Sequence, residues 1–222
     1  MAKNIKETIS KTISAPLYDE KGQKSGEIGL NTAVFGAKPN FDLMAQAVLV
    51  SLGNQRLGLA KVKTRGEVSL TTRKMYAQKH TGRARHGAAS APIFVGGGVA
   101  HGPKPGKREK FLNDKMKKMA TISALSQKWQ EGKVAVLEKI VFPEISTKKA
   151  KNLLQSISPA KKILLVEDSA NKVIEKSCKN LPWINVALAL NVDILAILNC
   201  DSLILEKSAL STLEKRLLTN AA

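Results

Sequence analysis

The apolar run I-L-L-V at residues 163–166 stands between Lys162 and Glu167. A short run of this kind, bounded by charge, is typical of a strand that is buried on both faces of a sheet. Similar runs occur at 134–137, 184–188 and 203–205, and helix-like segments lie between or after them at 148–157, 170–179, 192–198 and 208–218. The alternation predicts βαβ units with right-handed crossovers, in an α/β fold whose mostly parallel sheet of about four strands is covered by helices on both faces.

Two longer helices are predicted outside this region. One starts after Pro39 and Asn40 and stops at Gly53; its apolar residues at helical spacing are Phe41, Met44, Ala45, Val48, Leu49 and Leu52. The other covers about 113–130, ends at Gly132, and turns Met116, Met119, Ala120, Ile122 and Trp129 inward. Apolar stripes at this spacing usually face a core, so both are interpreted as buried.

The charge of the chain is unevenly distributed. The 222 residues include 36 Lys plus Arg and 18 Asp plus Glu, a net charge of +18. Residues 53–118 hold 16 of the basic and 3 of the acidic residues, whereas 1–52 carry a net charge of +1 and 119–222 of +4. A merely soluble basic protein would spread its charge, so the concentration indicates a polyanionic partner, for which nucleic acid is the main candidate.

Residues 53–110 differ in composition from both flanks. They contain 10 of the 15 glycines and all three histidines, and their only aromatic residues are Tyr76 and Phe94. Hydrophobic periodicity is absent after Val68. A segment of this length without periodicity is uncommon in a compact domain unless it is functional or a linker. The sequence therefore predicts a single α/β domain, 1–222, interrupted at 53–110 by an extended loop that orders on RNA, with a solvated flexible linker as the alternative.

Motifs for small-molecule chemistry are weak. The glycines and prolines of 102–107 lack the spacing of a phosphate-binding loop, and Arg108 stands where Ser or Thr is required. No G-x-G-x-x-G follows a predicted strand. Glu167 and Asp168 end a predicted strand, where an α/β enzyme can place a catalytic carboxylate, but without a glycine loop or a partner base a solvated strand end is the favoured interpretation. We expect no cofactor and no small-molecule substrate.

The histidines and cysteines do not form a metal-binding pattern. His80, His86 and His101 have no cysteine nearby, so RNA contacts or neutral loop positions are favoured over zinc binding. Cys178 and Cys200 fall in or beside apolar runs without a metal-type spacing partner, which predicts buried thiols in a reduced compartment. No apolar stretch reaches 18 residues, so no membrane partner is expected.

Several motifs of the glycine-rich segment occur together. They are K-T-R-G-E-V at 63–68, T-G-R-A-R at 81–85, A-P-I-F at 91–94, and G-G-G-V followed by G-P-K-P from Gly96. In order and spacing this run from Arg56 to Gly106 resembles the family of the fourth protein of the large ribosomal subunit, and the α/β flanks extend the resemblance to most of the chain. Arg73-Lys74-Met75-Tyr76-Ala77 departs from the family's usual Lys-Lys-Pro-Trp-Arg; His80 replaces glycine and Phe94 tryptophan.

The resemblance implies a three-layer α/β/α domain and a long loop threaded into large-subunit rRNA, reaching the wall of the peptide exit tunnel. The implied function is that of a structural constituent that supports ribosome assembly and is not an enzyme, in a cytoplasmic or an organellar ribosome. The implied partners are large-subunit rRNA and neighbouring ribosomal proteins. An RNA-modifying enzyme and a general nucleic-acid-compacting protein are the alternatives.

Candidate rRNA-binding residues follow from the motifs and from the basic, hydroxyl and aromatic side chains around them. Matching motifs imply rRNA contacts for Arg56, Lys63, Arg65, Lys79, Thr81, Arg83 and Arg85. Further candidates are Lys61, Arg73, Lys74, Tyr76, Phe94, Lys104, Lys107 and Arg108. The tip at the tunnel is expected to comprise Tyr76, Ala77, Lys79 and His80.

Overall fold

A computed structural model describes residues 13–140, 142 and 144–219. The chain divides into two compact units, one formed by the residues up to 51 and from 111 onward, the other by residues 52–110. Within the described residues, no helix combines the length and the apolar character needed to cross a membrane.

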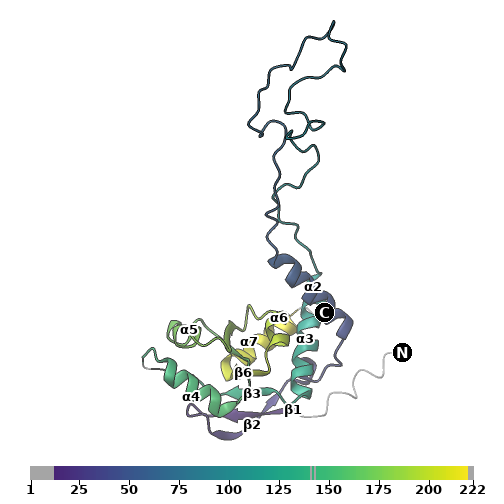
Figure 1. The fold of residues 1–222 in the computed structure, drawn as a ribbon. Helices are drawn as coiled ribbons and strands as arrows, with labels where there is room; N and C mark the ends of the chain where they lie inside the picture. Colours follow the sequence, from purple (N-terminus) through teal and green to yellow (C-terminus); the bar gives the residue numbers. More distant parts are fainter. Residues whose placement is uncertain (1–12, 141, 143, 220–222) are drawn as a thin grey trace, which may run out of the picture. The chain divides into compact units, whose positions relative to one another are not determined.

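The first unit is built on a six-stranded sheet with the order β2-β1-β3-β6-β4-β5 (Figure 1). The strands are β1 (Ile13–Tyr18), β2 (Lys24–Leu30), β3 (Val134–Leu137), β4 (Ile163–Glu167), β5 (Ile184–Leu188) and β6 (Ser202–Glu206). β1 and β2 pair antiparallel, and all other neighbours pair parallel. The predicted mostly parallel α/β sheet is confirmed, but the expected number of about four strands is wrong.

The two unpredicted strands lack the apolar runs of the other four. β1 carries Pro16 and small residues, and β2 reads K-S-G-E-I-G-L. Both glycines of β2 have open space around them. Strands at the antiparallel side of a sheet need bury only part of their surface, so their sequences resemble turns more than core strands.

Seven helices are assigned among the described residues: α1 (Thr32–Phe35), α2 (Phe41–Gln55), α3 (Asp114–Gln130), α4 (Thr147–Ile157), α5 (Lys172–Lys179), α6 (Ile194–Asn199) and α7 (Lys207–Leu218). All six predicted helices are present, and only the short α1 was not predicted. Asn31 caps α1 by accepting a hydrogen bond from the backbone N–H of Ala33.

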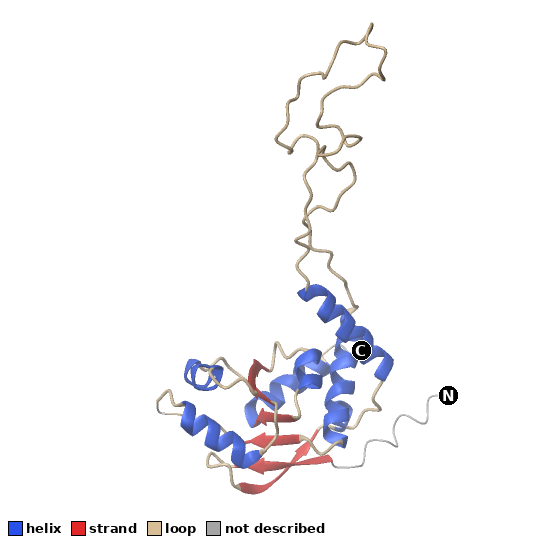
Figure 2. Cartoon of the chain, viewed as in Figure 1, coloured by secondary structure: helices blue, strands red, loops and turns tan. Residues whose placement is uncertain are grey.

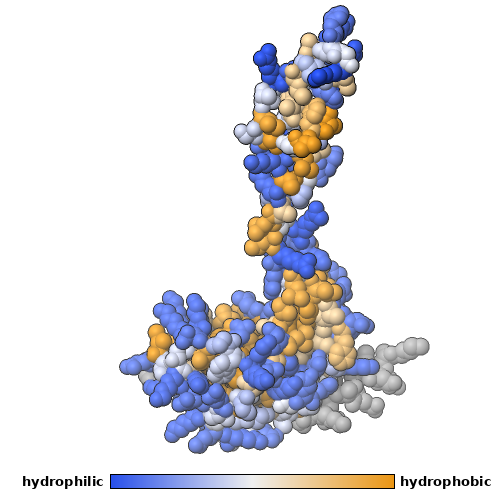
Figure 3. Space-filling view, viewed as in Figure 1, coloured by the Kyte–Doolittle hydropathy of each residue, from blue (hydrophilic) through white to orange (hydrophobic). Residues whose placement is uncertain are grey.

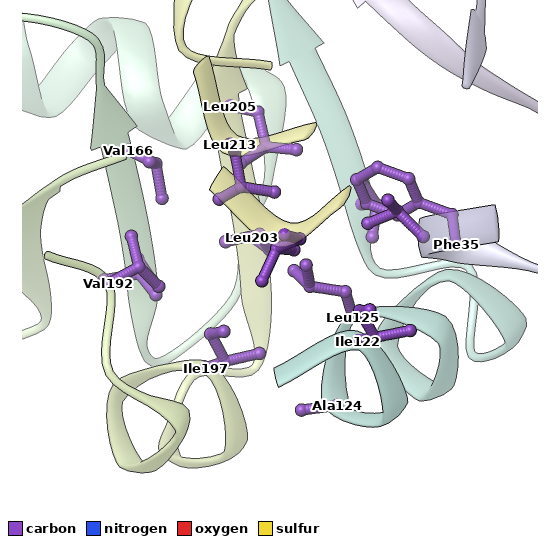
Figure 4. Packing of buried hydrophobic residues seen from close by; sticks show 14 of the residues in the cluster. Phe35, Ile122, Ala124, Leu125, Val166, Val192, Ile197, Leu203, Leu205 and Leu213 are labelled. Atoms are coloured by element: carbon purple, nitrogen blue, oxygen red, sulfur yellow. The ribbon is translucent and has the colours of Figure 1, made fainter. Parts of the chain in front are cut away.

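Successive side chains along the central strands point to opposite faces of the sheet and so contribute to two separate hydrophobic cores. Val134 and Val136 of β3 belong to the core that α1, α2, α3, α6 and α7 cover, and Figure 4 shows its packing around Phe35 and Leu125. Ala135 and Leu137 belong to the opposite core, covered by α4 and α5. Because both faces of the sheet are packed against helices, the fold is a three-layer α/β/α arrangement, as the resemblance implied.

Two predicted helix stripes need correction. In α2 only Met44 and Ala47 are buried, whereas Phe41 and Leu49 are 65% and 63% exposed. In α3 Ala120 and Ile122 are buried as predicted, Met116 and Trp129 are partly buried, and Met119 is 54% exposed. Gly53 does not stop α2, which continues to Gln55. Spacing alone locates a stripe but does not show which part of it a neighbouring layer covers.

Glu167 is buried, which contradicts the expected solvated strand end. Its side chain is 2% exposed, and among the described residues its Oε1 has no hydrogen-bond partner. Burial, together with the charges of Glu206 and Glu175, raises the pKa of Glu167 from 4.5 to about 7, against the lowering effect of a hydrogen bond from the backbone of Asn171. The carboxylate lies beneath α5 because it continues the inward alternation of Ile163 and Leu165.

The two cysteines are free and buried, as predicted. Cys178 lies in the core under α4 and α5, and Cys200 in the opposite core. Burial raises the pKa of Cys178 to about 11, so its thiol is protonated at neutral pH and unreactive.

Candidate nucleic-acid interface

The second unit is a loop whose two arms are joined by backbone hydrogen bonds. Figure 2 shows no regular helix or strand between the end of α2 and the start of α3. The backbone N–H of Gly106 donates to Gly58 over 3.1 Å, that of Val99 to Lys63 over 3.0 Å, and that of Met75 to Gly87 over 3.0 Å. We call residues 56–75 the first arm and 87–110 the second arm. Their cross-connections give an irregular segment a defined backbone path.

Three glycines allow the arms to approach closely. A Cβ on Gly58 would lie 2.1 Å from the carbonyl oxygen of Gly106, and one on Gly98 would lie 2.2 Å from the backbone nitrogen of Arg65. At Gly102 it would lie 1.9 Å from the side chain of Val62. At Gly58 and Gly98 the missing Cβ therefore lets two backbones pass without a clash, and at Gly102 it leaves room for the side chain of Val62.

Asn54 closes the base of the loop. Its Nδ2 donates to the carbonyl oxygen of Lys110 over 3.0 Å, and its Oδ1 accepts from the backbone N–H of Lys110 over 2.8 Å. The side chain thus satisfies both backbone groups of one residue, as a neighbouring strand would. This role of Asn54 could not be predicted from the sequence, because an asparagine near a helix end carries no signal for a partner 56 positions away.

The motif K-T-R-G-E-V forms a turn held by Glu67. Its carboxylate accepts from the backbone N–H of Thr64 over 3.0 Å, and the backbone N–H of Glu67 donates back to the Thr64 carbonyl over 2.9 Å. The bond from Thr64, followed by the charge of Lys61 at 3.9 Å, lowers the pKa of Glu67. The one acidic residue of the motif therefore shapes the backbone, and the cations around it stay exposed.

Cations alternate with inward-facing residues before this turn. Lys61, Lys63 and Arg65 are exposed, whereas Val62 and Thr64 between them are partly buried. An extended backbone places every second side chain on the same side, so the three cations project together. This period of two, over only five residues, is the sequence signal for the shared direction of the three cations.

Three aromatic rings meet between the arms and the segment that joins them. The ring of His86 packs edge-to-face against Phe94 with centroids 5.0 Å apart, and against Tyr76 at 6.4 Å. The Tyr76 hydroxyl donates to the carbonyl oxygen of Ala84. All three rings are partly buried. Tyr76 and Phe94 were predicted as rRNA-binding residues; here they also stabilise the loop, which gives His86 a structural role that the sequence did not suggest.

The expected tip contains a left-handed turn. His80 has a φ of 63° and Gly82 a φ of 65°. Glycine adopts this conformation freely, whereas a residue with a Cβ is destabilised there by roughly 1–2 kcal/mol. His80 stands where the family usually has glycine, so the substitution keeps the backbone conformation at a small cost. Ala77, Lys79 and His80 are exposed.

All the predicted cationic contact residues are exposed on this unit, as is Thr81. The cations are Arg56, Lys61, Lys63, Arg65, Arg73, Lys74, Lys79, Arg83, Arg85, Lys104, Lys107 and Arg108. Only Lys61 and Lys107 form ion pairs with acidic residues among the described side chains, with Glu67 and Glu109. The remaining guanidinium and ammonium groups are open to phosphate oxygens, the chemistry for which Arg and Lys are suited.

Other chemistry is not supported at this unit. Among the described residues, no group of three or more His, Cys, Asp or Glu side chains is arranged to hold a metal ion. Residues 102–106 have no regular structure and no helix follows them directly, so a phosphate-binding loop of the strand-turn-helix type is not formed. His86 contacts aromatic rings, while His80 and His101 are exposed.

A sequence profile described as the ribosomal protein L4/L1 family matches residues 28–216, which include the sheet, the helices and the whole loop. The chain belongs to this family. It is accordingly a structural component of the ribosome and not an enzyme, as the motifs of the loop predicted.

Curated relatives of the family extend the comparison. The large ribosomal subunit protein uL4 of Thermotoga petrophila is 45% identical over 179 residues, covering 79% of this chain and 76% of the relative. Those of Natranaerobius thermophilus and Heliobacterium modesticaldum are 38% and 36% identical over 199 residues, covering 90% of this chain and 96% of each relative. All three are bacterial, which agrees with the predicted cytoplasmic ribosome.

Substitution of Gly98 by Ala should separate the two arms, because the new Cβ would lie 2.2 Å from the backbone of Arg65. Overpacking of this kind costs about 1–3 kcal/mol, so amide hydrogen exchange at Val99, whose N–H donates to Lys63 of the other arm, should accelerate roughly tenfold or more. Gly66→Ala is the matched control, since a Cβ there meets no atom within 4 Å. Equal exchange in the two variants would show that the arms are not held together at this point.

Proposed function

We propose that residues 53–110 bind large-subunit rRNA, support the assembly of the subunit, and line the nascent-peptide exit tunnel at the tip formed by Tyr76, Ala77, Lys79 and His80. The observation that carries the proposal is the exposure of the twelve predicted cations on a loop whose backbone is held by its own hydrogen bonds. In this proposal the chain is a single α/β domain interrupted at 53–110, and its neighbours are rRNA and other large-subunit proteins.

The physical basis is phosphate neutralisation by a partly preorganised segment. Each cation that meets a phosphate releases condensed counterions, which supplies affinity without sequence recognition. The cross-arm bonds reduce the entropy that binding must otherwise remove, because the arms already lie side by side. Arg83 and Arg85 are exposed and lie in the chain within three residues of His86, which belongs to the aromatic group of Tyr76, His86 and Phe94. This arrangement favours contacts with phosphates and unstacked bases in the same region.

A salt titration tests the rRNA-binding role. If about eight of the cations meet phosphates, the slope of log affinity against log salt should be roughly −6 to −7. Changing Arg83 and Arg85 to Ala should flatten the slope by about one to two. Lys148 and Lys149 of α4 provide the matched control, since they are exposed and carry the same charge. A slope that changes only with the control pair would place the RNA-binding surface on the α/β unit.

A further inference from the structure

One face of α2 carries an exposed apolar stripe. Phe41 and Leu49 are 65% and 63% exposed, and Ala45 between them is exposed. At 100° per residue these positions fall within a single arc of the helix. Met44 and Ala47, which pack into the core, lie on a different arc. Figure 3 shows hydrophobic residues gathered over α2.

The charge of α2 separates it from the rest of this basic chain. Its fifteen residues read F-D-L-M-A-Q-A-V-L-V-S-L-G-N-Q and include no Lys or Arg. Asp42, beside the stripe, is the only charged residue, and no ion pair of Asp42 occurs among the described side chains. In a chain with a net charge of +18, this surface is the opposite of one suited to phosphate. An apolar surface of Phe41, Ala45 and Leu49 with one carboxylate at its edge instead fits a protein.

We propose that the stripe of Phe41, Ala45 and Leu49 docks an apolar segment of a neighbouring protein of the large subunit, with a Lys or Arg of that protein facing Asp42. The proposal rests on the proposed function, because it assumes incorporation into the subunit. It divides the chain into an RNA-binding surface on the loop, residues 56–110, and a protein-binding surface on the Phe41–Leu49 part of α2. Phe41 and Leu49 are its central contacts, since large exposed apolar side chains contribute most when a partner desolvates them.

Site-specific photo-crosslinking in purified, assembled large subunits tests the docking surface. A benzophenone amino acid replaces Ala45, and irradiated products are treated separately with protease and nuclease, then identified by mass spectrometry. The expected product joins the chain to one other ribosomal protein and resists nuclease. A product with rRNA, with a second copy of the chain or with another segment of the same chain would overturn the proposal, as would the absence of any product.

Charge substitutions in the same photo-reactive chain supply the matched comparison. Leu49→Glu should reduce the cross-link at least fivefold, whereas Gln46→Glu, an exposed position outside the stripe, should leave it unchanged. Equal loss in both variants, or none in either, would contradict docking at the stripe.

Both variants should bind isolated large-subunit rRNA with the same slope of log affinity against log salt as the unmodified chain. If the unmodified chain itself shows no salt-dependent rRNA binding, the proposed function fails, and that outcome is distinct from failure of the docking surface.

Discussion

Replacing residues 59–105 by two glycines is expected to reduce affinity for large-subunit rRNA by roughly 10³-fold at 0.2 M salt while the α/β unit remains folded. The deletion removes nine Lys and Arg residues and one Glu. The structure shows that Gly58 and Gly106, which the two glycines would join, already lie close together. The backbone N–H of Gly106 donates to the carbonyl oxygen of Gly58 over 3.1 Å, so Gly58, two glycines and Gly106 form a β-turn with its usual hydrogen bond.

Folding of the shortened chain is measured by its thermal midpoint. Closing a much shorter loop costs less entropy, by up to roughly 2–3 kcal/mol for this difference in length, so the midpoint should be equal or higher. The Asn54–Lys110 pair at the base is retained. A lower midpoint would show that the loop contributes to the core, and unchanged rRNA affinity would show that binding lies elsewhere.

A full-length chain with the same nine cations changed to Gln separates charge from shape. Loss of affinity equal to that of the deletion would assign the effect to phosphate contacts. A smaller loss would assign part of it to the backbone path and to the aromatic group of Tyr76, His86 and Phe94.

Substitution of Glu167 by Gln or Met should stabilise the protein by up to roughly 3 kcal/mol at pH 8 and have little effect at pH 4.5. Burial raises the pKa of this carboxyl from 4.5 to about 7. The folded state therefore binds the proton more tightly than the unfolded state does. The resulting destabilisation begins as the pH rises above 4.5 and is complete above about 7.

Chemical denaturation at the two pH values measures the effect. Gln leaves a polar group at the position of Oε1, which lacks a hydrogen-bond partner among the described residues, whereas Met removes it. Met should therefore stabilise at least as much as Gln. Exposed Glu138 provides the control, and Glu138→Gln should be neutral at both pH values. If both Glu167 variants are less stable at pH 8, the carboxylate is held by interactions stronger than its burial penalty.

The sequence predicted the elements that bury continuous apolar surface. The strands at 134–137 and 184–188 have the predicted bounds, whereas β4 is one residue longer at its end and β6 is one residue longer at each end. β1 and β2 were missed because Pro16 and the glycines of β2 give them the composition of turns. The inward orientation of Phe41 and Leu49 was wrong because helical spacing does not show where the neighbouring layer ends.

At the candidate interface the sequence identified side-chain chemistry but not the backbone contacts. The exposed Lys and Arg residues could be predicted from composition and motifs, because their proposed contacts with phosphate require only a positive charge and exposure to solvent. The parts played by Gly98, Asn54 and His86 depend on residues between 8 and 56 positions away in the chain. No local pattern encodes such contacts. Glycine in particular is frequent both in flexible linkers and where two backbones cross closely, so its presence does not distinguish the two.

The pairing of β1 with β3 has a consequence for the order of events during synthesis. Leu17 lies opposite Val136, so 119 positions must be translated between the two partners. At about 5–20 residues per second this takes roughly 6–24 s, during which the edge of β1 that later pairs with β3 has no partner strand. The whole basic loop emerges within that interval, before the centre of the sheet exists. Its cations are therefore exposed to cellular polyanions while the β1 edge is still open, and such an unpaired edge can pair with a strand of another chain.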